Sequence, residues 1–119
     1  MSNFRKLLVW QKAMSLTTKI YTSTKNFPKE EIFGLTSQLR LCAISIPSNI
    51  AEGLGRDSNN ELIRFINIAV GSLFELQTQL EIAKNICYLN TEEFNNLYED
   101  NREVERMLIA FLKKLKEDK

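Results

Sequence analysis

The strongest constraint on the fold is an apolar repeat in the second half of the chain. Eight residues follow one another at alternating steps of four and three positions: Leu62, Ile66, Ala69, Leu73, Leu76, Leu80, Ala83 and Cys87. These steps keep returning to one side of an α-helix, so the repeat predicts a single long amphipathic helix. The segment 58–61 reads Ser-Asn-Asn-Glu, a capping-box pattern, which predicts the helix start.

A second repeat with the same spacing follows. Its members are Phe94, Leu97, Asn101, Val104, Leu108, Phe111 and Leu115. Thr91 precedes the repeat and is predicted to cap the helix. Asn101 is the polar member, and two interpretations stay open: a buried asparagine that fixes register or partner number, or one that is partly exposed.

Two more helices are predicted earlier in the chain, over residues about 4–25 and about 29–53. The first ends before Pro28, which disfavours helix in the residue that precedes it. The second reaches Gly53-Leu54-Gly55, where we expect glycine in the left-handed conformation of a C-cap. Four helices, short connections and no strand pattern predict an all-α fold, an up-down-up-down four-helix bundle that forms a single domain over residues 1–119.

Pro47 lies inside the second predicted helix. Proline has no amide hydrogen to donate, and its ring crowds the carbonyl four residues earlier, that of Ala43, so we expect a kink at Pro47. Ser45 and Ser48 are candidates to donate hydrogen bonds to the freed carbonyls, and Asn49 places an amide near the bend. The kink either wraps the helix around its neighbours or shapes a groove for a ligand.

Several kinds of chemistry are excluded by composition. The chain contains no histidine, which removes Ser-His and Cys-His nucleophile pairs and imidazole metal sites. Cys42 and Cys87 are far apart in apolar surroundings and are expected to be buried and reduced. We therefore expect no enzyme and no cofactor. No apolar stretch is long enough for a membrane span and no signal peptide is recognisable, so we expect a cytoplasmic protein without membrane contact.

The segment SQLRLCAISIPSNIAEGLGR at residues 37–56, with VWQKA before it and GSLFELQTQL after it, resembles a known family. It is similar to the four-helix-bundle proteins encoded by intervening sequences in bacterial 23S rRNA genes. Similar proteins act as accessory factors of diversity-generating retroelements. That resemblance implies a homopentameric barrel of bundles that binds nucleic acid and a reverse transcriptase. Arg40 and Arg56 match the pattern of the family, whereas Leu41 stands where many relatives have a second basic residue.

Charge is distributed unevenly, although the formal net charge is only +1. Arg5, Lys12 and Lys19 recur every seven residues in a segment without acidic residues, while residues 92–105 are strongly acidic. Three interpretations stay open: a basic stripe that follows phosphates, basic and acidic surfaces that meet between subunits, and a solvated helix face. With the two family positions, the candidate nucleic-acid-binding residues are Arg5, Lys12, Lys19, Arg40 and Arg56.

The helices also carry more apolar surface than a lone bundle needs. The apolar residues off the repeat of the third predicted helix are Ile63, Phe65, Ile68, Val70, Phe74, Ile82 and Ile86, and those off the repeat of the first are Leu7, Trp10, Met14 and Tyr21. A broad core stripe and contact with another subunit are both consistent with this surplus. We expect a homo-oligomeric, non-enzymatic accessory protein that associates with RNA, with a ribonucleoprotein or with other nucleic acid. The alternative is an oligomeric scaffold that binds only protein.

Overall fold

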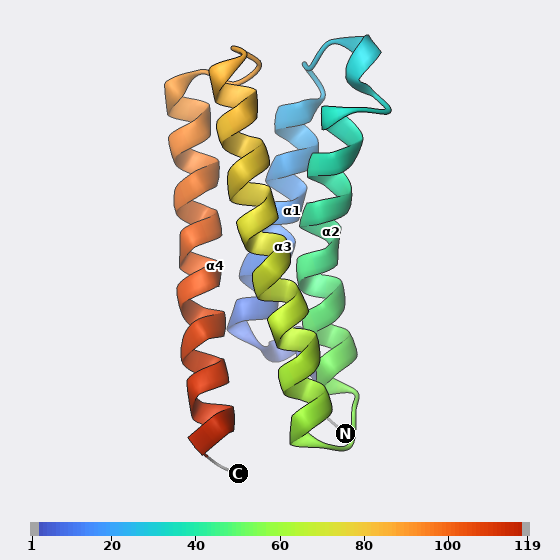
Figure 1. The fold of residues 1–119 in the computed structure, drawn as a ribbon, viewed down its shortest axis with the longest axis vertical. Helices are drawn as coiled ribbons and strands as arrows, with labels where there is room; N and C mark the ends of the chain where they lie inside the picture. The colour runs from blue at the N-terminus through green and yellow to red at the C-terminus, as the bar shows by residue number, and fades with distance from the viewer. Residues whose placement is uncertain (1–2, 118–119) are drawn as a thin grey trace.

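A computed structural model describes residues 3–117, which form a four-helix bundle (Figure 1). The helices are α1 (Leu8–Thr24), α2 (Leu35–Leu54), α3 (Asn59–Asn85) and α4 (Thr91–Glu117). Short 3-10 turns, η1 (Phe4–Lys6) and η2 (Lys29–Glu31), precede α1 and α2, and no strand occurs in residues 3–117. The chain runs up, down, up and down, so the all-α bundle predicted from the sequence is confirmed.

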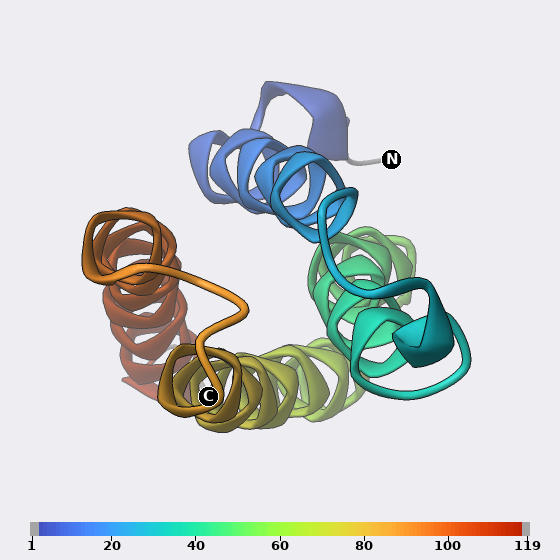
Figure 2. The ribbon, with the colours of Figure 1, turned by 90° about the horizontal axis from the view of Figure 1, so that it is seen from above.

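The four helices form a closed ring when seen along the bundle axis (Figure 2). Each helix packs against the next, and α1 and α4 complete the ring. Helix α1 begins and α4 ends at the same end of the bundle, where the α2–α3 turn also lies (Figure 1). Residues far apart in sequence thereby become neighbours along α1, which contacts both α2 and α4.

The core contains most of the predicted apolar repeat of α3. Ile66, Ala69, Leu73, Leu76, Leu80 and Ala83 are all completely buried. The prediction is wrong for Cys87, which lies beyond the end of α3 and is exposed. Cys87 adopts a left-handed conformation with φ of 68°, because the chain must turn sharply there toward α4.

Two predicted caps differ from those observed. The Ser58 hydroxyl accepts from the Glu61 amide at 3.2 Å, as expected, but the Glu61 carboxylate pairs with Arg64 instead of completing the capping box. At α4, Thr91 is not the capping side chain. Asn90 Oδ1 accepts from the Glu93 amide at 2.8 Å, and Glu93 Oε1 accepts from the Asn90 amide at 2.9 Å. This reciprocal pair satisfies two amides at the start of α4.

Helix α2 begins later than predicted. The predicted start at residue 29 corresponds to η2, and α2 itself starts at Leu35 after a turn. Gly34 precedes α2 and has no side chain to cap it, so the Glu31 carboxylate accepts from the Leu35 amide at 3.0 Å. The first predicted helix is divided in a similar way, because Leu7 is extended between η1 and α1.

The glycines near the end of α2 have a different role from the one predicted. No glycine in residues 3–117 has a positive φ, and Gly55 ends the helix at φ of −84°, so the left-handed cap expected there is wrong. Gly53 lies within α2 against α3. A Cβ at Gly53 would lie 2.9 Å from Phe65 Cβ and 3.0 Å from Leu62 Cδ1. Glycine is needed at this position because the two helices approach too closely for a larger residue.

Pro47 lies inside α2, and a hydroxyl of α1 lies beside the carbonyl that its missing amide leaves free. The Thr17 hydroxyl lies 3.1 Å from the Ala43 carbonyl oxygen, the acceptor that an amide at position 47 would use, and 2.8 Å from its own Ala13 carbonyl. Of the two predicted serine donors, Ser45 pairs instead with Ser72 of α3 at 2.7 Å, and Asn49 Nδ2 donates to the Ser45 carbonyl at 2.7 Å. The kink at Pro47 stays a prediction.

Asn101 is completely buried in α4, which decides between the two interpretations of this residue. Its Nδ2 donates to the Leu73 carbonyl at 3.1 Å, and its Oδ1 accepts from Gln77 Nε2 at 2.7 Å. Gln77 also donates to Glu105 at 2.8 Å. This network ties α3 to α4 at one register, because any sliding of the helices would leave buried polar groups without partners.

Candidate nucleic-acid interface

The five predicted basic residues do not form one surface. Lys12 and Lys19 lie between α1 and α4, Arg56 lies in the α2–α3 turn, and Arg5 and Arg40 lie on the side of α1 and α2. The three places differ in how much of the positive charge is already matched by carboxylates.

Lys12 and Lys19 are paired with acidic residues of α4. Lys12 Nζ lies 3.2 Å from Glu103, and Lys19 Nζ lies 2.6 Å from Asp100. Lys19 also donates to Asn96 at 3.2 Å. The basic and acidic segments therefore meet within one chain, in partly exposed ion pairs. Such pairs add little stability but lower the charge that the α1–α4 side presents to a phosphate.

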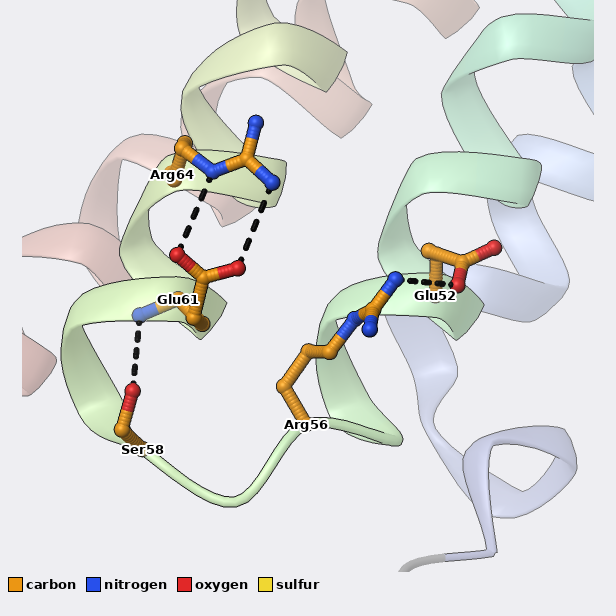
Figure 3. Close-up of polar contacts among 5 residues, drawn as sticks. All are labelled: Glu52, Arg56, Ser58, Glu61 and Arg64. Carbon is orange, nitrogen blue, oxygen red and sulfur yellow. Dashed lines mark hydrogen bonds and ion pairs between the residues drawn. The ribbon is translucent and has the colours of Figure 1, made fainter.

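Arg56 belongs to a compact cluster at the α2–α3 turn (Figure 3). Its guanidinium lies 2.8 Å from Glu52, and Arg64 lies 3.2 Å from Glu61. Both guanidinium groups also lie near the ring of Phe65, at 4.9 Å for Arg56 and 4.5 Å for Arg64. Each arginine thus pairs with one carboxylate, and both arginines contact the same aromatic ring. This arrangement stabilises the turn, and the net charge of the cluster is close to zero.

Arg64 was missed in the sequence, and Phe65 was recognised only as an apolar residue off the repeat of the third predicted helix. The spacing of three between Glu61 and Arg64 is a signal for an intrahelical ion pair, because side chains three apart are neighbours on a helix. The approach of Arg56 to Phe65 depends on the path of the turn, and no local pattern indicates it.

Arg40 has no carboxylate partner within residues 3–117. Its Nε donates to the Thr24 hydroxyl at 2.9 Å, and its guanidinium lies 4.8 Å from the centre of the Tyr21 ring. Thr24 in turn donates to the carbonyl of Ile20 at 2.8 Å. Arg40 therefore lies against α1, and no carboxylate within residues 3–117 pairs with its guanidinium.

Arg5 is likewise without an ion pair in the described part of the chain. Its guanidinium lies 4.7 Å from the centre of the Phe4 ring, and Phe4 meets Trp10 edge-on at 5.3 Å. Gln11 Nε2 donates to the Arg5 carbonyl at 2.9 Å, which fixes η1 to the first turn of α1. Beside these residues lies a surface groove between α1 and α2, with Met14, Ile44 and Pro47 among its lining residues.

The groups with shifted pKa values do not form a reactive site. Burial, with a smaller contribution from Glu75, raises the pKa of the Cys42 thiol to about 12, and the thiol donates to the Ser72 carbonyl. A thiol with such a pKa is a poor nucleophile. The Leu35 amide and then the Tyr88 hydroxyl lower the pKa of Glu31, whose carboxylate accepts from both. Across residues 3–117 no cluster of three or more potential metal ligands occurs.

One family model covers most of the chain. The model of the 23S rRNA-intervening sequence protein matches residues 5–110. The chain belongs to the 23S rRNA-intervening sequence protein family. This confirms the family resemblance recognised in SIPSNIAEG and the segments around it.

A solved structure supports the same assignment. It is the crystal structure of a protein with unknown function from the S23 ribosomal protein family of Bacteroides thetaiotaomicron VPI-5482. It is similar with a TM-score of 0.81 and 25% sequence identity, over 89% of this chain and 99% of that chain. No curated protein matches the chain.

Within this member of the 23S rRNA-intervening sequence protein family, the identifying string SIPSNIAEG lies in α2. Pro47 meets Thr17 of α1 through the Ala43 carbonyl, Gly53 permits close contact with α3, and Glu52 pairs with Arg56. These contacts join α2 to both of its neighbouring helices, so helix packing explains these residues of the string. No helix among residues 3–117 has the length and apolarity required to traverse a lipid bilayer.

Proposed function

We propose that the protein is a non-enzymatic, homo-oligomeric accessory protein that associates with RNA or another nucleic acid. The observation that carries the proposal is an apolar outer surface on α3 and its C-cap, formed by Ile68, Phe74, Ile82 and Ile86, which are between 40% and 48% exposed. Assembly through such a surface would repeat each weak cationic site once per subunit, and repetition raises the overall affinity.

Gly71 lies on this outer surface at a position where the described chain does not require glycine. It lies in the middle of α3, three residues from both Ile68 and Phe74, so the three positions are neighbours on the helix. A Cβ at Gly71 would meet no atom within 4 Å, so nothing within the described chain requires glycine there. Glycine inside a helix costs roughly 0.5–1 kcal/mol relative to alanine. The close approach of a helix from a second copy would account for it.

The nucleic-acid part of the proposal draws on Arg5 and Arg40, whose charges are not matched by carboxylates of residues 3–117. One observation favours the second candidate, an oligomeric scaffold that binds only protein: Lys12 and Lys19, two of the five predicted cations, are paired with α4. Family resemblance supplies the finer points. It implies a homopentamer and, in one setting of the family, a reverse transcriptase as partner. The cytoplasmic location is proposed from the sequence.

Light scattering coupled to size exclusion tests the oligomer. We expect a mass of several times the 13.8 kDa of one chain, five times for the pentamer. Gly71→Gln should reduce the mass without loss of helical circular dichroism, because the added side chain separates the surfaces. Gly71→Ala is the matched control and should change it far less. A wild-type protein that elutes as a single copy at working concentrations would refute the proposal.

Filter binding to structured RNA across a salt series tests the association with nucleic acid. Binding that weakens as salt rises is expected, because phosphate contacts release counterions. Absence of binding at low salt would leave the scaffold. A pull-down from the native host with nuclease treatment then separates the two candidates, since a protein-only partner survives digestion.

A further inference from the structure

The side of the bundle formed by α1 and α2 combines unmatched arginines with aromatic rings. We define the α1–α2 face by Arg5, Trp10 and Tyr21 from η1 and α1, with Arg40 and Ile44 from α2. We propose that the α1–α2 face binds an unpaired nucleic-acid strand by stacking bases on its aromatic and guanidinium groups. This inference rests on the proposed function and gives it a place and a substrate class.

The helical register brings these residues to one side. Trp10 and Tyr21 are eleven positions apart, about three turns, with Met14 between them on the same side of α1. On α2, Arg40, Ile44 and Pro47 recur at steps of four and three. The Thr17 hydroxyl beside the Ala43 carbonyl and the bond from Arg40 to Thr24 show that these two stripes adjoin.

At each end of the α1–α2 face an arginine lies over an aromatic ring. At one end Arg5 lies 4.7 Å from the Phe4 ring centre, and Phe4 contacts Trp10. At the other end Arg40 lies 4.8 Å from the Tyr21 ring centre. Arginine beside an exposed or partly exposed ring serves both parts of a nucleotide, since the ring stacks on the base and the guanidinium stacks or contacts phosphate.

Charge favours a nucleic acid over an apolar helix as the occupant. No acidic residue of residues 3–117 lines the groove between Trp10 and Ile44, and neither Arg5 nor Arg40 forms an ion pair in that part of the chain. An apolar helix packed here would bury two cations without counter-ions, which is costly. A phosphate backbone supplies the missing charge.

The length of the α1–α2 face determines how many bases of the strand it can contact. Trp10 and Tyr21 are separated by roughly 16 Å along α1. At the 3.4 Å spacing of stacked bases this distance corresponds to roughly five bases. A duplex keeps its bases stacked on one another and out of reach of the rings, so preference for an unpaired strand follows.

Trp10 is the only tryptophan of the chain and reports directly on this face. A twelve-residue uridine oligomer should quench its fluorescence to saturation, whereas a duplex RNA of equal length should quench it little. Tyr21→Leu should weaken binding of the oligomer roughly tenfold, since stacking on one aromatic is worth about 1–3 kcal/mol per base. Tyr21→Phe keeps the ring and should bind within about twofold of the wild type.

Filter binding on the same samples distinguishes failure of the α1–α2 face as the binding site from failure of nucleic-acid binding altogether. Retention of RNA with unchanged Trp10 fluorescence, or equal affinity of Tyr21→Leu and Tyr21→Phe, would overturn the face while the nucleic-acid function stands. No retention of any RNA would remove both. A lower assembly mass for Tyr21→Leu in light scattering, with wild-type Trp10 unresponsive, would assign the face to a second copy and overturn the proposal.

Discussion

The two flanks of α1 carry positive charge in opposite ways. Toward α4, Lys12 and Lys19 are held by Glu103 and Asp100. Toward α2, Arg5 and Arg40 lie on aromatic rings without a carboxylate in residues 3–117. The contact that joins α1 to α2 near Pro47 is uncharged, from the Thr17 hydroxyl to the Ala43 carbonyl. A cation without a carboxylate partner is therefore more available to a ligand than a paired cation is. The position of a cation in the sequence does not reveal its partner.

The largest effect on stability is expected from the uncharged contact between α1 and α2. Thr17→Val keeps the shape of the side chain but removes the hydroxyl beside the carbonyl of Ala43, a residue that is completely buried. We expect the free energy of unfolding to fall by about 1–2 kcal/mol, because a buried acceptor loses its donor. Urea denaturation measures this change. A decrease below about 0.3 kcal/mol would show that the hydroxyl does not compensate for Pro47.

Pro47→Ala sharpens this test. Alanine restores an amide hydrogen that can donate to the Ala43 carbonyl within α2. In the Pro47→Ala background, Thr17→Val should cost at least about 0.5 kcal/mol less than in the wild type, as measured by a double-mutant cycle. Strictly additive changes in stability would mean that the two residues act independently.

The next effect, on the flank of α1 toward α4, should be smaller. Lys19→Gln removes the ion pair with Asp100, in which both side chains are a third or more exposed. A decrease in stability of about 0.2–1 kcal/mol is expected, and it should shrink at high salt because exposed charges are screened. The decrease from Thr17→Val should persist at the same salt concentration. If both decreases respond equally to salt, the distinction between the flanks fails.

The smallest effect should come from Glu31, which caps α2 at the end of the α1–α2 connection. Its pKa lies below the usual 4.5 in the folded chain, because its carboxylate accepts first from the Leu35 amide and then from the Tyr88 hydroxyl. The stabilisation is therefore present above pH 4.5 and disappears as the pH falls through the lower folded value. Glu31→Gln should be less stable than the wild type at pH 7, and the gap should narrow toward pH 3 in urea titrations. A constant gap would contradict this assignment.

The fold was largely predictable because its signals are local. The four-and-three spacing of the α3 repeat, and Ser58 at its start, are properties of a single helix. Some of the predictions that failed depend on other helices. The hydroxyl beside the Ala43 carbonyl comes from Thr17 of α1, and Gly53 is glycine because Phe65 of α3 lies against it.

The candidate site was predictable only in part for the same reason. Each of the five cations was visible in the sequence, but Lys19 and Asp100 are 81 residues apart and meet only through the packing of α1 on α4. The relevance of Tyr21 depends on Arg40, whose guanidinium lies over its ring. Pairing across helices is set by tertiary structure, which no local spacing encodes.

The salt dependence of RNA binding compares the two flanks most directly. The double variant Arg5→Gln with Arg40→Gln should bind a uridine oligomer more weakly than the wild type does. Its slope of log affinity against log salt should be shallower, by about 0.7 for each phosphate that the arginines no longer neutralise. Lys12→Gln with Lys19→Gln should leave the slope unchanged. A slope that falls only in the lysine double variant would contradict the account.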